Sequence, residues 1–540
     1  MTRTTRSTAS STAMYIRVGA LASSIALVAG AARAGTGDGE VTTLRARSPA
    51  ASASRGATLP DSLTGQKLSW KSCPAPTTLQ GADAGAPGRL PDGTPWECAT
   101  LKVPLDYAHP GGDTINLALI RAKARPEDGQ KRIGSLVFNF GGPGVSGVAE
   151  LPQFANDYRD LHARYDLVSF DPRGVGASAP VHCLNDKDTD AANELDGNPD
   201  NDKELKADLA QYLAACEKNS GTVLPHVSTT NAARDMDLLR HVLGDDKLHY
   251  FGTSYGTELG GTYAHLFPEH VGRAVFDAVV DPTQDPVQQS LAQTRGFQLA
   301  LDNYLEDCAR QPNCPTGSSV EEGRKKIADL LKRLDARPLP TDDGRKVTHD
   351  LAELGIASAL YSKDTWPDLT QALQEAEQEK TGNTLLMLAD WLNGRDSHGH
   401  YDNSGPAQIA IDCADFHQRY TVDDVKAKLP EFRKASPVFG DSGAWSLLEC
   451  TDWPVKGEAK HPQVAAKGSA PILLVGNTGD PATPYAGTRR MADELGKGVG
   501  AELTYKGQGH GAYGTNTCVT KAVNAYLLDG KVPKDGVVCM

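Results

Sequence analysis

The chain has 540 residues, of which 39% are hydrophobic and 23% charged, a balance that excludes a disordered or fibrous protein. Its formal net charge is −13, from 55 basic and 68 acidic residues, and a surface of that sign disfavours nucleic acid as a partner because it repels phosphates. The length permits two to four units, or one large fold with an insertion.

The first 34 residues have the pattern of a secretory signal peptide. A positive start is followed by an apolar or small run over 18–32, and small residues stand at Ala32 and Ala34. We therefore expect cleavage after Ala34 and a secreted, extracellular protein with no stable membrane association. An uncleaved membrane anchor is the alternative, but an apolar run of about 15 residues is short for a bilayer. The positive charges are Arg3, Arg6 and Arg17.

Residues 35–65 are rich in Gly, Ala, Ser, Thr and Arg and show no apolar period. This composition indicates a propeptide or linker rather than a packed element. A propeptide would make the protein a zymogen.

Short apolar runs then alternate with helical patterns. An amphipathic helix is predicted over 231–243, and strand patterns return near the C-terminus at 470–475 and 501–505. This alternation predicts an α/β fold, with a mostly parallel sheet and helices on both faces. The earlier strands are predicted at 101–107, 115–120, 135–140, 165–170, 247–251 and 274–280.

Helical periods dominate the stretch between these two groups of strands, which indicates a helical cap insertion. The helices are predicted at 287–308, 320–334, 351–361 and 366–379. The expected organisation is a signal peptide at 1–34, a propeptide or linker at 35–65, an α/β core at 66–285 and 446–540, and the cap insertion at 286–445.

A serine follows the strand predicted at 247–251, in Gly252-Thr253-Ser254-Tyr255-Gly256. On a sharp strand-to-helix turn the serine oxygen projects outward, and glycines two residues either side remove side chains that would clash. The motif alone is weak in a chain with 54 glycines, but its place between a strand and a helix favours a nucleophile.

Asp480 and His510 follow the last two predicted strands, and the order Ser254, Asp480, His510 is that of the α/β hydrolases. In a triad, His510 would take the serine proton and later protonate the leaving amine, while Asp480 would hold the imidazole tautomer. Taken singly, Asp480 fits equally well an aspartate that caps a turn, and His510 fits equally well a histidine on the surface. Their order and placement together favour the triad.

An oxyanion site needs backbone N–H groups aimed at the developing charge. Tyr255, next after the nucleophile, should supply one, and Gly142 in the glycine run after the strand at 135–140 should supply the other. The alternative for this run is a plain tight turn. It is not a phosphate loop, because no Gly-Lys-Ser/Thr follows.

The ten cysteines agree with export. None forms a C-x-x-C pair, and no Cys/His cluster has zinc spacing. An even number in an exported chain suggests disulfides, although scattered buried thiols are the alternative and connectivity does not follow from sequence. Pairing in sequential order would close five short loops: Cys73 with Cys98, Cys183 with Cys216, Cys308 with Cys314, Cys413 with Cys450, and Cys518 with Cys539.

Three strand-end motifs together resemble the proline-iminopeptidase clan of α/β hydrolases, and within it the secreted bacterial tripeptidyl aminopeptidases. The resemblance runs from about residue 68 to 540. Phe140 stands where iminopeptidases usually carry histidine, which argues against proline-specific release of single residues. The motifs are Phe140-Gly141-Gly142-Pro143-Gly144, Asp171-Pro172-Arg173-Gly174-Val175-Gly176 and Gly252-Thr253-Ser254-Tyr255-Gly256-Thr257.

The resemblance implies a secreted serine exopeptidase that cleaves short peptides, often tripeptides, from the free N-termini of peptides and proteins through an acyl-enzyme on Ser254. Such an enzyme needs an acidic partner for the terminal ammonium. Asp412, Asp415 and Glu258 are the candidates, although most acids are solvated surface charges or helix caps. Asp171 and Arg173 are better explained as an ion pair that fixes a loop than as substrate contacts.

Other functions fit parts of the same pattern. A carboxylesterase or lipase shares the triad and oxyanion loop, and fold alone does not separate it from a peptidase. The insertion lacks a long apolar lid run, which disfavours a lipase. A binding module without activity would need a lost triad residue, and a metalloenzyme would need a motif such as H-E-x-x-H. We expect a monomeric enzyme without a cofactor or metal.

Overall fold

The computed structural model describes residues 58–81, 85, 87–126, 129–194, 202–534 and 536–540. The predicted signal peptide and most of the predicted propeptide or linker therefore lie outside the described residues. The end of that linker is already packed: helix α1 (Asp61–Thr64) buries Leu63 against the core. The expectation of an unpacked segment up to residue 65 is wrong at this point, because a single leucine finds an apolar partner surface.

The core is one sheet whose order, within the described residues, is β1-β2-β3-β5-β4-β6-β7-β10-β11-β12. Neighbours from β5 to β12 run parallel, whereas β1, β2 and β3 join the edge antiparallel. The strands are β1 (Lys71–Ser72), β2 (Glu97–Pro104), β3 (Thr114–Ala122), β4 (Gly134–Asn139), β5 (Tyr165–Phe170), β6 (Leu248–Thr253), β7 (Val271–Asp277), β10 (Ile472–Gly479), β11 (Gly500–Gln508) and β12 (Val537–Cys539).

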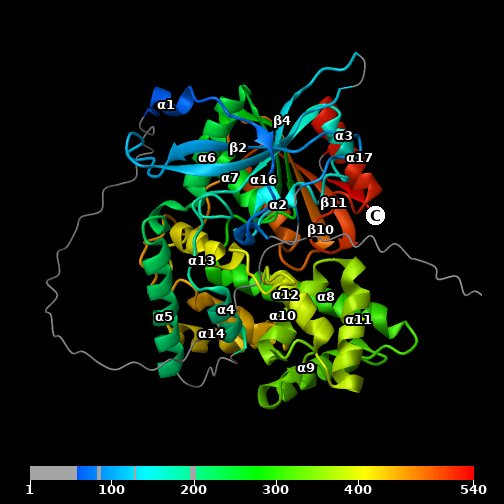
Figure 1. Cartoon of the computed structure of the whole chain (residues 1–540). Coiled ribbons are helices and arrows are strands. Elements are labelled where there is room, and N and C mark those ends of the chain that lie inside the picture. The colour runs from blue at the N-terminus through cyan, green and yellow to red at the C-terminus, as the bar shows by residue number, and fades with distance from the viewer. Residues whose placement is uncertain (1–57, 82–84, 86, 127–128, 195–201, 535) are drawn as a thin grey trace, which may run out of the picture.

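Helices cover both faces of this sheet (Figure 1). Leu136 and Phe138 of β4 join the apolar cluster of one face, while Val137 between them joins the cluster of the other. The continuous apolar run of β4 is thus a strand buried on both sides. The first face carries α2 (Gly147–Glu150), α3 (Arg159–His162) and α17 (Thr517–Asp529), and the second carries α6 (Thr229–Leu243), α7 (Tyr255–Leu266) and α16 (Ala486–Leu495). The predicted α/β-hydrolase fold is confirmed.

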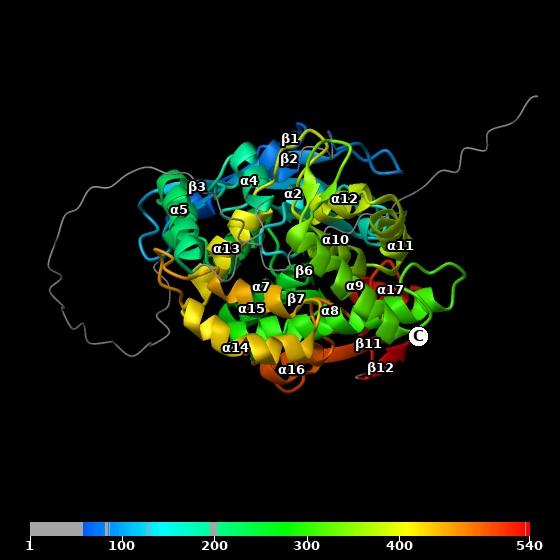
Figure 2. The same ribbon diagram turned by 90° about the horizontal axis from the view of Figure 1, so that it is seen from below.

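A helical region inserted between β7 and β10 lies below the sheet in Figure 1 and spreads across it in Figure 2. Its first helix begins at Pro286, because Asp285 and Gln288 form a capping box and proline needs no N–H partner there. The helices are α8 (Pro286–Ala309), α9 (Val320–Ala336), α10 (His349–Leu360), α11 (Trp366–Gln374), α12 (Asn383–Leu392), α13 (Ser404–Asp415), α14 (Val422–Ala435) and α15 (Gly440–Trp445), with a small hairpin of β8 (Leu339–Pro340) and β9 (Lys346–Val347).

Two further helices belong to this cap, although they lie between β5 and β6 in a stretch expected to be core. They are α4 (Asp186–Asn193) and α5 (Asp202–Ser220), and both lie beside α13 in Figures 1 and 2. Leu209 of α5 packs in one cluster with Val425 and Leu448 of the inserted region. Cys216 of the same helix, with Tyr212 and Leu213 beside it, belongs instead to the cluster that covers the sheet, so α5 bridges the inserted region and the core.

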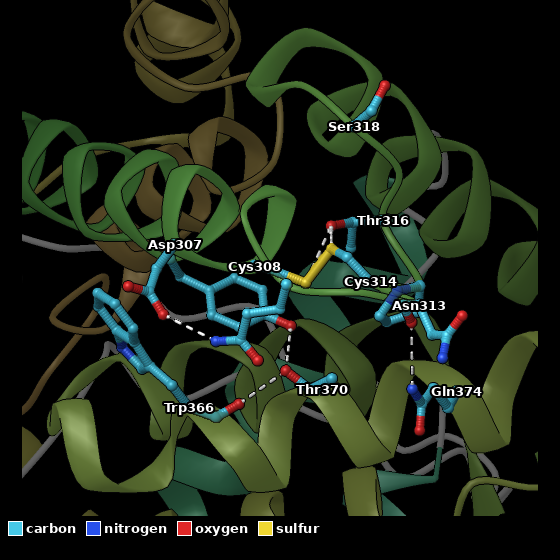
Figure 3. The surroundings of a disulfide bond; sticks show 12 residues. Asp307, Cys308, Asn313, Cys314, Thr316, Ser318, Trp366, Thr370 and Gln374 are labelled. Carbon is cyan, nitrogen blue, oxygen red and sulfur yellow. Dashed lines mark hydrogen bonds between the residues drawn. A yellow bond between two sulfur atoms is a disulfide. The ribbon is translucent and has the colours of Figure 1, made fainter.

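Five disulfides join the ten cysteines in sequential pairs. The bond between Cys308 and Cys314 closes the turn after α8, beside α11 (Figure 3). Next to it, the Tyr304 hydroxyl lies 3.0 Å from Thr370 Oγ1 and so ties α8 to α11. This disulfide content fits an extracytoplasmic protein. No helix in the described part of the chain is both long and apolar enough to cross a membrane.

The expected ion pair between Asp171 and Arg173 is wrong. Arg173 is fully buried and donates from Nε and Nη2 to Asp235 on α6, at 2.7 and 2.8 Å. Asp171 instead accepts from Ser146 Oγ at 2.6 Å and from the Ala177 N–H at 2.9 Å. The two side chains leave the loop toward different elements, so each fixes a different part of the core.

Removing Asp235 should strongly destabilise the fold. Asp235→Ala would leave the Arg173 guanidinium buried without its counter-charge, which costs about 3–5 kcal/mol. Urea denaturation followed by circular dichroism measures this. The double variant Arg173→Met with Asp235→Leu should recover most of the loss, because both charges leave together. A loss below about 1 kcal/mol for the single variant would contradict the assigned role.

Candidate active site

Ser254 lies at the turn between β6 and α7 and has a left-handed backbone, with φ 57° and ψ −126°. A Cβ on Gly252 would lie 2.4 Å from the Gly256 carbonyl oxygen, and one on Gly256 would lie 2.7 Å from that of Asn139. Only glycine fits at both positions. The motif thus has the steric reason proposed for it, and the sharp turn holds Ser254 at the N-terminus of a helix.

The glycine run after β4 packs directly against this turn. A Cβ on Gly141 would lie 2.9 Å from Ser254 Cβ, and Gly141 and Gly142 both have positive φ, at 91° and 104°. Gly142, Ser254 and Tyr255 line the same pocket. The structure therefore brings the two residues expected to supply oxyanion N–H groups to the serine, one at the start of α7 where the helix dipole favours negative charge.

Asp480 and His510 form a buried hydrogen bond, 2.7 Å between Oδ1 and Nδ1. The carboxylate is held by three further donors: the Ala482 N–H at 3.0 Å, the Thr483 N–H at 2.9 Å and the Thr483 hydroxyl at 3.0 Å. Because Nδ1 faces the carboxylate, the proton of the neutral ring sits there and Nε2 is left as the basic nitrogen. Nε2 is buried and bonds to no residue that the structure describes.

The cap also holds this histidine. The His510 N–H donates to the Tyr361 carbonyl at 2.8 Å, at the end of α10. The two rings meet edge to face, with their centroids 5.4 Å apart. The histidine of the core is thus oriented in part by a residue of the inserted region.

Asp277, at the end of β7, links the serine turn to the histidine loop. Its carbonyl accepts from the Ser254 N–H at 3.0 Å. Its carboxylate accepts from the N–H groups of Ala512 at 3.0 Å and Tyr513 at 2.9 Å, just after His510. Burial raises the pKa of Asp277, and these two N–H groups oppose part of that rise. No sequence motif indicated this residue.

A pocket of about 990 Å³ opens beside Ser254 and carries three carboxylates, Glu258, Asp412 and Glu449. Glu258 is on α7, four residues after the serine and so about 6 Å along the helix axis. Asp412 comes from α13 and Glu449 follows α15, both in the cap. The pocket thus lies between core and cap, and two of the three predicted acidic candidates line it.

The carboxylates in this pocket are only weakly compensated, by Arg419 at Glu449 and by Gln408 at Asp412. Burial raises the pKa of Glu258 to about 7, and its carboxylate has neither hydrogen bond nor ion pair to a residue in the described ranges. Burial likewise raises the pKa of Glu449 to about 7, with Arg419 opposing. The pKa of Asp412 is raised well above its usual range by burial and then by the charges of Glu449 and Glu258. A cation entering the pocket would relieve this crowding.

Asp415, the third candidate, is not in the pocket. Its Oδ1 accepts from the Thr229 N–H at 2.8 Å and its Oδ2 from the Thr229 hydroxyl at 2.6 Å, at the start of α6. The same hydroxyl lies 2.6 Å from the Tyr255 hydroxyl. Asp415 therefore caps a helix and braces the residue after Ser254, which is a structural role.

Sequence reasoning missed Glu449, although a signal for it was present. The structure has a disulfide between Cys413 and Cys450, and these residues directly adjoin Asp412 and Glu449. Once that pairing is assumed, the two carboxylates must lie near each other. Thr483, which fixes Asp480 and lines the same pocket, gave no such signal.

The chain is similar to known proteins along most of its length. Residues 436–539 match the family described as TAP-like protein. Serine protease Hip1 of Mycobacterium tuberculosis is 38% identical over 495 residues, which cover 88% of this chain and 91% of the relative. The chain belongs to the TAP-like family of α/β hydrolases.

Two further TAP-like relatives have different names. Carboxylesterase B of Mycobacterium tuberculosis is 36% identical over 455 residues, covering 82% of this chain and 86% of the relative. Tripeptidyl aminopeptidase of Streptomyces lividans is 30% identical over 466 residues, which cover 85% of this chain and 86% of the relative. The TAP-like chain is therefore a serine hydrolase, and the names of its relatives include both an esterase and a peptidase.

Asp480→Asn should abolish most activity while preserving the fold. The amide would favour the wrong imidazole tautomer, which lowers kcat by about 10⁴-fold in such a site. Steady-state hydrolysis of an activated ester measures this, and thermal unfolding checks the fold. Ser254→Ala should abolish the phosphonylation that an active-site phosphonate causes in the wild type, as measured by mass spectrometry. A Ser254→Ala protein that is still labelled would show that another residue is the nucleophile.

Proposed function

We propose that this TAP-like protein is an extracytoplasmic serine exopeptidase that releases short peptides, chiefly tripeptides, from free N-termini. Its signal peptide, 1–34, would be removed after Ala34. The observation that carries the proposal is the group of weakly compensated carboxylates in the pocket of Ser254. An esterase needs no such charge, whereas an enzyme that binds a terminal ammonium does.

The proposed chemistry gives Ser254, His510 and Asp480 the roles expected from the sequence. Ser254 Oγ attacks the scissile carbonyl carbon while His510 Nε2 takes its proton, and the carbonyl oxygen becomes an oxyanion that accepts from the Tyr255 and Gly142 N–H groups. The tetrahedral intermediate collapses as His510 gives its proton to the leaving amine, and an ester on Ser254 remains. Water, deprotonated by His510, then attacks the ester carbon, the bond to Ser254 Oγ breaks as His510 returns its proton to that oxygen, and the short peptide leaves with a new carboxylate.

The ammonium of the substrate matches the acidic pocket in both charge and hydrogen bonding. It has three N–H donors and no acceptor, while the three carboxylates are acceptors. In a partly buried site this attraction is stronger than in water. A substrate with an apolar acyl group would instead leave the carboxylates buried and unpaired, which is unfavourable. The site therefore favours peptides with a free N-terminus over simple esters.

The cap gives the enzyme a way to limit chain length. The pocket is walled by Gln289 and Gln293 of α8 and by Gln408 of α13, in addition to the carboxylates. A peptide whose terminal ammonium binds among the carboxylates would have its first residue against this wall, so the cap would limit the number of residues between the N-terminus and Ser254.

The second candidate function is a carboxylesterase, which one relative's name carries and which the same triad would serve. A matched chromogenic series separates the two functions: one to four residues, each with a free and a blocked N-terminus. We expect a peak at three residues and a kcat/KM at least about 10²-fold higher for free amines, because blocking leaves charged groups unpaired.

In the same assay Glu258→Gln should lower kcat/KM for free amines by about 10- to 100-fold, since it removes one buried charge partner. Hydrolysis of a small neutral ester should change little in this variant. Equal turnover of free and blocked peptides by the wild type would refute the exopeptidase proposal and favour the esterase.

The preference for a free amine should depend on pH. Glu258 and Glu449 have pKa values raised to about 7, so below pH 7 they gain protons and lose the charge that attracts the ammonium. Above about pH 8 the substrate amine loses its own charge. The ratio of kcat/KM for a free-amine peptide to that for a neutral ester should therefore peak between about pH 7 and 8. A ratio that stays flat from pH 5 to 8 would contradict the assignment.

A further inference from the structure

A second pocket, of about 1030 Å³, lies on the other side of α13 from Ser254. It is bounded by α4, α5 and α13, and it contains none of the triad or oxyanion residues. Much of its lining is apolar: Leu79, Leu184, Leu209, Leu213, Pro406 and Ile409.

The polar groups at the edge of this pocket are largely occupied by other protein groups. Asp186 accepts from the Tyr401 N–H at 3.0 Å and lies 2.8 Å from His400 Nδ1. Asn403 donates to the Gly174 carbonyl at 2.8 Å and accepts from the Gly176 N–H at 2.8 Å. The interior is therefore better suited to an apolar group than to a charged ligand.

Glu449 connects the two pockets, because it lines both. The intervening helix, α13, turns Gln408 and Asp412 toward the first pocket and Gly405, Pro406 and Ile409 toward the second. Burial raises the pKa of Asp412 in one pocket and of Tyr212 in the other, and the charge of Glu449 adds to both rises. Glu449 therefore acts electrostatically on both sides of the helix.

The covalent geometry of an amino acid places its side chain next to its ammonium. The N–Cα bond is about 1.46 Å long, so a terminal residue bound through its nitrogen at Glu449 has its Cβ within a few ångström of that carboxylate. The Ser254 pocket has some apolar lining, at Val280, Phe416 and Leu447, but it also carries the carboxylates Glu258 and Asp412, which are poor partners for an apolar side chain. The second pocket offers the larger aliphatic lining beside Glu449.

We propose that the second pocket binds the side chain of the substrate's N-terminal residue and selects large apolar side chains, aromatic or branched aliphatic. The inference rests on the proposed exopeptidase function. It adds a specificity subsite that is separate from the catalytic groups and built from α4, α5 and α13. Burial of such a side chain should raise kcat/KM about ten- to hundredfold over glycine.

Gly405 offers a direct test. It is the second residue of α13 and lines the second pocket, and a Cβ built on it meets no atom within 4 Å. A side chain can therefore start from this position without a clash at its first atom, Gly405→Phe should occupy the pocket with its ring, and replacing glycine in a helix favours folding. Gly405→Ala, which adds only a methyl group, is the matched control.

The assay uses tripeptide p-nitroanilides that differ only in the first residue: Gly, Ala, Leu or Phe. In the wild type and Gly405→Ala, Leu and Phe should exceed Gly by about ten- to hundredfold in kcat/KM. In Gly405→Phe this preference should fall to within about threefold, while the Gly-first substrate keeps its rate within about twofold. That retained rate also shows that the variant is folded.

A charge switch gives an independent second variant. Leu213 lines the pocket from α5 and is only partly buried, so Leu213→Glu should be tolerated. It should weaken turnover of Leu-first and Phe-first tripeptides and improve that of Arg-first ones by about tenfold.

The failures of the two proposals are distinguishable. If the wild type needs a free amine but shows no preference at the first residue, or if both variants keep the wild-type preference, the subsite assignment is overturned and the exopeptidase function stands. If blocked and free tripeptides are cleaved equally, the exopeptidase function fails, and the subsite assignment fails with it.

Discussion

A buried histidine can act as a base only when its surroundings decide which nitrogen carries the proton, and this requirement organises much of the molecule. Asp480 faces Nδ1 at 2.7 Å and is itself held by three donors. The Tyr361 carbonyl holds the backbone of His510 from the cap, and Asp277 holds the next residues from β7. The core alone therefore does not complete the site. A displaced cap would release the histidine loop from one of its anchors, so the inserted helices would contribute to catalysis as well as to the shape of the pocket.

The same cap concentrates carboxylates where folding alone would not place them. Glu258 and Glu449 have pKa values near 7, above those of the unfolded chain, so each carboxylate lowers the stability of the fold at a pH where it is charged. Elsewhere the fold uses buried charge differently: Arg173 and Asp235 neutralise each other and satisfy nearby carbonyls. The contrast separates a structural ion pair from a binding site. Carboxylates kept buried without a partner are stabilised by what binds them, and five disulfides help a folded chain to tolerate the cost.

Much of the catalytic site could be predicted from sequence because its residues follow strands. Carboxyl ends of parallel strands meet at one edge of a sheet, so the strand pattern alone places Ser254, Asp480 and Gly142 near one another. Long-range packing could not be predicted in this way. Asp171 and Arg173 are two residues apart, yet they bind different elements, and α5 packs against the inserted helices as well as against the core. Asp415 matched the pattern of an acidic candidate, and only the Thr229 contacts show that it caps a helix.

The difference between a peptidase and an esterase in this family must then lie in groups other than the triad. Serine, histidine, aspartate and the oxyanion N–H groups stabilise the same tetrahedral intermediate whether an amide or an ester is attacked. What differs is the binding energy available from the rest of the substrate, and an amide needs more of it because its leaving group is poorer. Here that energy would come from an ammonium among Glu258, Asp412 and Glu449. Two of these belong to the cap, so substrate choice can change by variation of the inserted helices while the catalytic core is preserved.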